Sequence, residues 1–344
     1  MIYSKPRAWI VRGILFCCIL ATLPAHATFP GKNGRIAFIL GPDVYTMNPD
    51  GSSVKQVTNL GERAAFWESW SPDGKQIVFN IFSPPFFSAG EIWLVNADGS
   101  NQRLVLKEDN FNDERPSFTP DGQSLLFDRC NLQIEECAIY KVALDGHGLT
   151  QLTKYELGIA DLSPMLSPDG QTLVFTGIAH EGIFAALYVK AGTASSLLRR
   201  ITPAEQEDQL ADWSPDGTKI VFSSHCCNPQ NQEIWNMDSD GSGRRRLTNN
   251  GTNYFAGAHD SAPSWSPQGD AIVFERDAPD FSSSAIFVIK SDGSRPKKVI
   301  DLSRSARAAR MQNRIKPGAA MSAQRRMEQI EEGGFLPRWG AAPD

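Results

Sequence analysis

The chain has 344 residues, of which 41% are hydrophobic and 21% are charged, and this composition is typical of a folded globular protein. Its 34 Lys and Arg residues against 39 Asp and Glu residues give a formal net charge of −5. Such an acidic chain lacks the basic surface that displaces counterions from a phosphate backbone, so we expect no nucleic-acid partner.

Residues 1–27 have the pattern of an export signal peptide. A basic start precedes an apolar run over 13–23, and an Ala-His-Ala cleavage site ends the segment. The apolar run is shorter than the ~20 residues of a membrane-spanning helix, and no longer run occurs. We therefore expect a periplasmic or secreted protein without a transmembrane segment. Lipidation of Cys17 is the alternative, which the bulky Phe16 before it disfavours.

The rest of the chain repeats two motifs at intervals of roughly 48 residues. The first has the form Trp-Ser-Pro-Asp-Gly-x-x-Ile-Val-Phe and occurs at 70–79, 118–127, 166–175, 213–222 and 265–274. The second has the form x-Ile-Trp-x-x-x-x-Asp-Gly, with Tyr or Phe for Trp in two copies, and occurs at 91–99, 138–146, 233–241 and 285–293, with a degenerate version at 186–192. Pro-Asp-Gly and Asp-Gly favour tight turns, and Ile-Val-Phe is typical of a buried strand. Repeated units of four antiparallel strands predict a β-propeller.

The paired motifs resemble the WD40-like PD40 repeat of the TolB family's β-propeller over residues 31–301. The resemblance implies a propeller fold and association with the cell envelope. Proteins of the TolB type carry a further N-terminal domain before the propeller, whereas here the repeats follow the signal peptide directly. The resemblance therefore implies the propeller fold of TolB but not its complete function.

Residues 28–344 are expected to form a single all-β domain, a six-bladed propeller. The first unit, over 28–59, lacks its first strand, and residues 334–340 repeat the Pro-x-Trp pattern and then stop. We therefore predict that the C-terminus completes blade 1 in a velcro closure, which removes an exposed sheet edge. A loose tail is the alternative. Blades 2–6 are expected over 66–300.

Residues 301–333 interrupt the repeats. They are rich in Arg, at mostly helical spacing, and we expect a short basic helical insertion. It would dock a partner or an anionic surface, or else pack on the acidic rim of its own propeller.

Each face of a propeller carries one kind of connection. Turns between strands one and two and between strands three and four lie on one face, the turn face. Loops between strands two and three, and the connections between blades, lie on the other, the variable face. Variable loops on a rigid scaffold and aromatic anchors within a charged rim favour protein binding. The binding residues predicted there are Glu68, Asp113, Glu114, Asp161, Asp208, Asp260, Phe111 and Phe255.

The repeat assigns these acids to interblade connections, which converge on the propeller axis. We therefore expect a negative funnel at one mouth of the channel. Such a funnel would suit a basic segment of a partner protein.

Four cysteines remain after signal cleavage. Cys130 and Cys137 flank one hairpin loop, and export permits a disulfide between them. Cys226 and Cys227 are adjacent, so a disulfide and two thiols both remain open. The absence of Cys-x-x-Cys pairs argues against a structural zinc site.

Three histidines fall on variable-face loops of adjacent blades, namely His180, His225 and His259. With Asp208 or Asp260 they would suit a divalent metal ion. The alternative function is therefore a propeller hydrolase or lyase that uses this metal on a carbohydrate.

Other signals of catalysis are weak. The sequence has no nucleophile elbow, no phosphate-binding loop and no dinucleotide fingerprint. We therefore predict a non-catalytic, monomeric binding module without a cofactor. Its expected partner is another envelope or secreted protein.

Overall fold

The computed structural model describes residues 29–83, 89–134, 136–154, 159–179, 185–191, 198–203, 206–225, 231–251, 257–302 and 337–343. The expected signal peptide lies outside these ranges, and so does all but the start of the expected helical insertion. His180, Phe255, Cys226 and Cys227 also lie outside them. Within them all regular structure is β-strand, and no helix there has the length and apolarity needed to cross a membrane.

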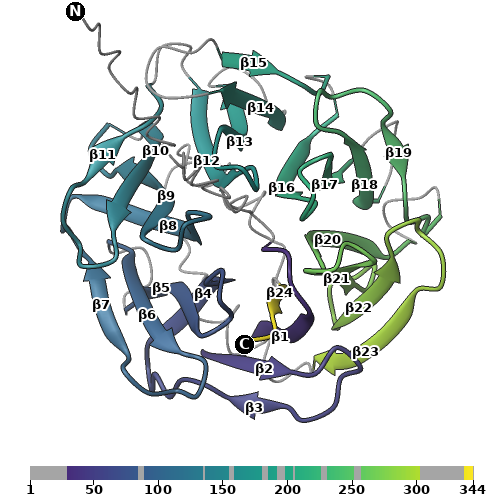
Figure 1. Cartoon of the computed structure of the whole chain (residues 1–344), viewed down its shortest axis with the longest axis horizontal. Coiled ribbons are helices and arrows are strands. Elements are labelled where there is room, and N and C mark those ends of the chain that lie inside the picture. The colour runs from purple at the N-terminus through teal and green to yellow at the C-terminus, as the bar shows by residue number, and fades with distance from the viewer. Residues whose placement is uncertain are drawn as a thin grey trace, which may run out of the picture.

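The strands form six antiparallel sheets of four, arranged as blades around a central axis (Figure 1). From the axis outward, the first three blades are β24 (Arg338–Ala341), β1 (Asn33–Leu40), β2 (Asp43–Met47) and β3 (Lys55–Gln56); β4 (Ala64–Trp70), β5 (Gln76–Phe82), β6 (Glu91–Asn96) and β7 (Arg103–Leu106); and β8 (Phe111–Phe118), β9 (Ser124–Asn131), β10 (Glu136–Ala143) and β11 (Thr150–Gln151). The other three are β12 (Ile159–Leu166), β13 (Thr172–Ala179), β14 (Ala185–Ala191) and β15 (Leu198–Arg200); β16 (Asp208–Trp213), β17 (Lys219–Ser224), β18 (Glu233–Asp238) and β19 (Arg245–Arg246); and β20 (His259–Trp265), β21 (Ala271–Asp277), β22 (Ser284–Lys290) and β23 (Lys297–Leu302). The predicted six-bladed propeller is confirmed, although β23 extends two residues into the range expected for the insertion.

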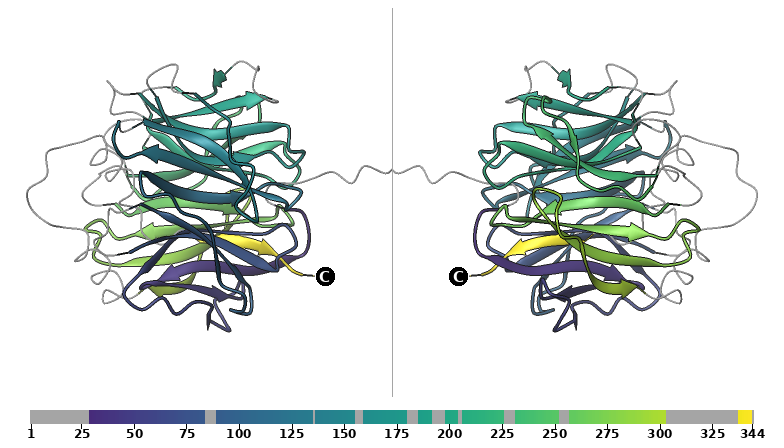
Figure 2. Two further views of the ribbon diagram at one scale, coloured as in Figure 1. Left: turned by 90° about the vertical axis from the view of Figure 1, so that its left-hand side faces the viewer. Right: turned by 90° about the vertical axis from the view of Figure 1, so that its right-hand side faces the viewer.

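The C-terminal strand closes the ring, as predicted. β24 pairs antiparallel with β1 and places Trp339 opposite Ile36. Segments from the two ends of the chain therefore lie side by side in blade 1 (Figures 1 and 2). The closing strand also fits tightly against blade 2, because a Cβ atom on Gly340 would lie 2.6 Å from the ring of Trp70. The closure pairs the inner edge of β1, which would otherwise be exposed.

The repeated motifs form the turns and the core that their chemistry dictates. In blade 2, Gly74 adopts a φ of +65° and its amide donates to the carbonyl oxygen of Ser71 at 3.0 Å. The Asp73 carboxylate accepts a hydrogen bond from the Ser71 hydroxyl at 2.6 Å. The phenylalanine of the second strand is fully buried in all six blades, at Phe38, Phe79, Phe127, Phe175, Phe222 and Phe274. Neighbouring blades pack against each other through several hydrophobic clusters, such as the one that Val174 and Leu187 of blade 4 form with Phe222 of blade 5.

The first strands of blades 2–6 share a β-bulge at the same position. Its left-handed residue is not glycine in any of them: Trp67 (φ 54°), Arg115 (φ 48°), Ser163 (φ 54°), Leu210 (φ 56°) and Ala262 (φ 52°). Side chains rarely tolerate this conformation, so neighbouring groups must hold it. In blades 4–6 the bulge amide donates to a polar side chain that follows the buried phenylalanine of the preceding blade, namely Asp128 (3.0 Å), Thr176 (3.3 Å) or Ser223 (3.1 Å). The bulges thereby link neighbouring blades close to the axis.

Candidate functional site

The acids expected on the variable face lie in the first strands of the blades. Their exposed fractions are 0% for Asp113, Asp208 and Asp260, 1% for Glu68, 3% for Asp161 and 6% for Glu114. The prediction that they face solvent on interblade connections is therefore wrong. The first strands begin several residues before the repeated motif, so these carboxylates are inside the blades.

Arginine side chains neutralise most of these acids. Three of the aspartates form paired hydrogen bonds with a guanidinium group: Asp113 with Arg129 (2.7 and 2.8 Å), Asp208 with Arg244 (2.6 and 2.8 Å) and Asp260 with Arg276 (2.6 and 2.8 Å). Each guanidinium also stacks on an aromatic ring, at 4.6 Å on Phe111, 4.9 Å on Trp235 and 4.5 Å on Phe287. Glu114 pairs with Arg115 at 3.1 Å. The expected negative funnel is therefore wrong, because these carboxylates serve as internal ion pairs.

Asp161 is the exception in this series. In blades 3 and 6 the residue opposite the buried aspartate is an arginine, but opposite Asp161 it is Gly177. Burial raises the pKa of Asp161 from 3.8 to about 7, against the lowering effects of a hydrogen bond from Thr153 and of the charge on Lys190. Asp161 can therefore take up a proton near neutral pH.

Replacing this carboxyl tests that assignment. Because the folded-state pKa lies above the usual value, the folded state loses stability as the pH rises from about 4 to about 7 and no further above that range. We expect Asp161→Asn to stabilise the protein by ~2 kcal/mol at pH 8 and by little at pH 4. Urea unfolding at the two pH values measures this difference. An equal effect at both would show that the carboxyl is not the cause.

The two described histidines of the proposed metal set have separate surroundings. Nδ1 of His225 lies 3.1 Å from Oε2 of Glu207. His259 is 2% exposed and stacks on Phe281 with the ring centroids 4.8 Å apart. Within the described ranges, no group of three or more His, Cys, Asp or Glu residues could hold a metal ion.

A hairpin of blade 3 presents two exposed apolar side chains on the variable face. Cys130 and Cys137, the pair expected from the sequence, form a disulfide across its neck. At its tip, Leu132 is 36% and Ile134 is 58% exposed. The amide of Leu132 donates to the carbonyl oxygen of Asn110 at 3.0 Å, which ties the tip to the adjoining interblade connection. The disulfide and this hydrogen bond thus tie both the neck of the hairpin and Leu132 to the blade.

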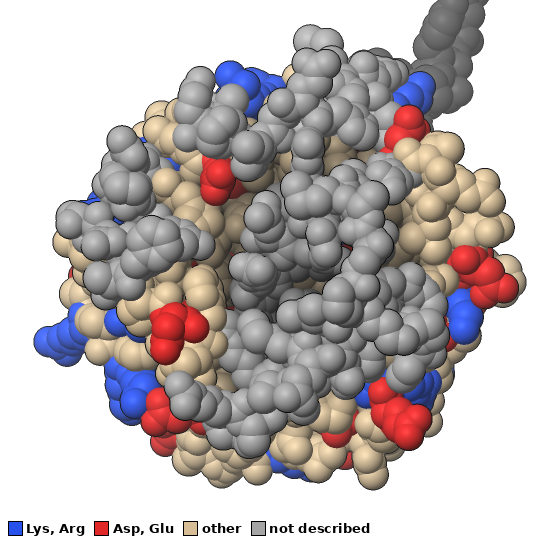
Figure 3. Space-filling view, turned by 180° about the vertical axis from the view of Figure 1, so that it is seen from behind, with Lys and Arg blue, Asp and Glu red and all other residues tan. Residues whose placement is uncertain are grey.

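Charge does not distinguish the variable face. Figure 3 shows this face, and in its described part acidic and basic side chains both occur around the rim. Recognition by this face would therefore depend on local features such as the blade 3 hairpin.

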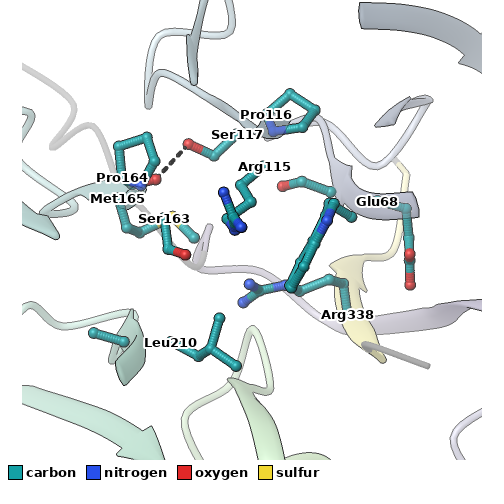
Figure 4. Close-up of a pocket in the computed structure, with 12 residues that line it drawn as sticks. Glu68, Arg115, Pro116, Ser117, Ser163, Pro164, Met165, Leu210 and Arg338 are labelled. Atoms are coloured by element: carbon teal, nitrogen blue, oxygen red, sulfur yellow. Dashed lines mark hydrogen bonds between the residues drawn. The ribbon is translucent and has the colours of Figure 1, made fainter. Parts of the chain in front are cut away.

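A pocket lies among the first strands of five blades. Its lining comes from β4, β8, β12, β16 and β24 and includes the bulge residues Trp67, Arg115, Ser163 and Leu210. The empty space amounts to about 370 Å³ when the part open to solvent is counted. In Figure 4, Arg115 and Arg338 extend into the same space, whereas the carboxylate of Glu68 points away from it. The bulge at Arg115 and the closing strand at Arg338 thus place two guanidinium groups in an axial pocket.

Fold and site together define a velcro-closed β-propeller with internal ion pairs, a disulfide-bonded variable-face hairpin and an axial pocket. The model of the TolB β-propeller domain family, PD40, matches residues 130–310, which is more than half of the chain. The chain belongs to this family.

Solved structures show the same fold. The structure of TolB from Acinetobacter baumannii is 21% identical with a TM-score of 0.66, covering 91% of this chain and 68% of that one. A TolB structure from Agrobacterium tumefaciens is also 21% identical with a TM-score of 0.60, covering 78% and 89%. An oligogalacturonate lyase in complex with manganese is 12% identical with a TM-score of 0.50, covering 79% and 74%. No curated protein matches the sequence.

Sequence reasoning missed the hairpin tip and the axial pocket. Leu132 and Ile134 are apolar residues in a short loop between two cysteines, which is a signal for an exposed contact site. Arg338 precedes the tryptophan of the closing strand, where the other blades carry Ser, Met or Asp. A comparison of equivalent positions across the repeats would have singled it out.

Proposed function

We propose that the chain is an exported, monomeric binding module whose variable face recognises another protein of the periplasm or cell envelope. The sequence of residues 1–27 supports export. The disulfide supports an oxidising compartment. The TolB-like propeller supports a role in protein interaction rather than catalysis.

The blade 3 hairpin carries the case for protein binding. Leu132 and Ile134 are exposed together on a loop that the disulfide and the hydrogen bond to Asn110 hold in place. A preformed loop loses little conformational entropy on binding, so its apolar contacts contribute more of their free energy to affinity. The complementary surface on the partner would be an apolar pocket, here called the socket, that takes up these two side chains.

The surroundings of the hairpin indicate the charge of that socket. Glu136 begins the second strand of the hairpin, and the side chain of Glu108, on the adjoining connection, is 43% exposed. Glu108 is 3.0 Å from the buried Arg129, so one acid at this edge already has a cation. A socket rimmed by Lys or Arg would complement the remaining acid, which fits a partner with a basic segment.

Substitution of Ile134 tests the role of the hairpin. We expect Ile134→Asp to lower capture of the envelope partner by about tenfold, because the charge cannot enter an apolar socket. The matched control is Leu104→Asp, since Leu104 is 44% exposed but lies on β7, the outer strand of blade 2. Capture is measured by chemical crosslinking in the envelope fraction, and folding by thermal melting. Equal loss with both variants, or none with either, would contradict the assignment.

A further inference from the structure

A buried donor in the axial pocket has no acceptor. Arg338 comes from the closing strand β24 and is partly buried. Its Nη1 atom is shielded from solvent and has no hydrogen-bond partner among the described residues. An unsatisfied, charged donor of this kind costs folding free energy. A ligand that brings an acceptor would recover that free energy.

Arg115 shows which acceptor satisfies a guanidinium group in this pocket. Its Nη1 atom lies 2.6 Å from Oδ2 of Asp128 and 3.1 Å from Oε2 of Glu114. Both acceptors are carboxylates, which match the fork of N–H groups on a guanidinium. Among the described residues, no carboxylate lies within ion-pair distance of Arg338. Glu68 lines the same pocket, but its carboxylate points away from the shared space (Figure 4).

The other walls limit the size and polarity of a ligand. Trp67, Met165 and Leu210 line the pocket, and the ring of Trp67 also covers the guanidinium of Arg115 at 4.8 Å. Because Arg115 is already paired with two carboxylates, Arg338 is the charged donor that these apolar walls leave for a ligand. Such a combination is typical of a site for a small molecule with one polar end.

We infer that the axial pocket binds the carboxylate of a ligand with a short apolar body. Arg338 holds the carboxylate, and Trp67, Met165 and Leu210 contact the apolar part. The ligand is either a free organic acid or the C-terminal carboxylate of a peptide. The site is separate from the proposed protein-binding hairpin, which is the loop between the second and third strands of blade 3.

Titration with simple probes tests this site. Butyrate is added to the purified full chain at constant ionic strength, and binding is followed by calorimetry, with butyramide as the neutral analogue. An acetylated tripeptide ending in valine is tested both as the free acid and as the amide, which separates the two ligand sources. We expect butyrate or the peptide acid to bind with a millimolar Kd and both amides to bind about tenfold more weakly or not at all.

Substitutions of Arg338 test whether this residue holds the carboxylate of the ligand. Arg338→Met keeps a long apolar stem but removes the charge, and we expect it to weaken carboxylate binding by about tenfold or more. Arg338→Lys is expected to retain part of the affinity. The matched control is Arg63→Met, since Arg63 stacks on Trp93 at 5.0 Å and does not line the pocket. The inference is overturned if acid and amide bind the parent protein equally, if no acid binds, or if Arg338→Met binds as well as the parent. The comparison of acid with amide in the parent holds even if that variant fails to fold.

Discussion

Removal of the closing strand is expected to abolish most of the stability of the propeller. Truncation before Pro337 deletes β24, which is the first strand of blade 1 and contributes the buried side chain of Trp339. It also exposes the ring of Trp70, against which Gly340 packs. Because small domains are stable by only about 5–15 kcal/mol, we expect a loss of at least 5 kcal/mol, seen as a lower melting temperature and faster proteolysis.

A shorter truncation provides the control. Removal of residues 343–344 leaves β24 intact and takes away only the exposed Pro343 and the last residue. This variant is expected to melt like the parent. If both truncated proteins melt within a degree or two of the parent, velcro closure does not stabilise the ring.

Arg129→Met is expected to destabilise the protein by about 3–5 kcal/mol at neutral pH, because it leaves the carboxylate of Asp113 buried without its ion pair. Burial raises the pKa of Asp113 even with the pair in place, so protonation at acidic pH relieves part of the cost in the variant. The loss measured by urea unfolding should therefore be smaller at pH 4 than at pH 7. The double variant Arg129→Met with Asp113→Asn should recover part of the stability.

An exposed ion pair gives the matched comparison. Lys298 and Asp301 lie 2.8 Å apart, with side chains that are 51% and 73% exposed. Lys298→Met should change stability by less than about 1 kcal/mol, since water and salt screen such a pair. If Arg129→Met costs no more than this, the buried acids are not held by their arginines.

The fold could be predicted because the sequence motifs that specify each blade are short and repeat along the chain. An Asp-Gly turn and the buried phenylalanine recur in each blade, and the Pro-x-Trp of the last residues matches residues 263–265 in the first strand of blade 6. The left-handed bulge was not predictable in this way. Its residues, among them Trp67 and Leu210, share no side-chain type. In blades 4–6 the acceptors that hold the bulge amides come from another blade.

The burial of the acids required knowledge of strand register. Asp113 faces Arg129, and Asp260 faces Arg276, only when the antiparallel pairing and the bulge are both known. When the register and the bulge are unknown, the sequence before each acid looks like a turn, and the acid is then interpreted as an exposed loop residue. The disulfide could be predicted without the strand register, because Cys130 and Cys137 flank a single short hairpin loop.

Site-specific photo-crosslinking tests the proposed function most directly. A photoreactive amino acid at position 134, on the variable-face hairpin, is compared in intact cells with the same amino acid at position 104, on the outer strand of blade 2. We predict one defined protein adduct from position 134, lost when Leu132 is replaced by Asp, and no such adduct from position 104. Equal adducts from both positions, or an adduct from position 104 alone, would contradict recognition by the blade 3 hairpin.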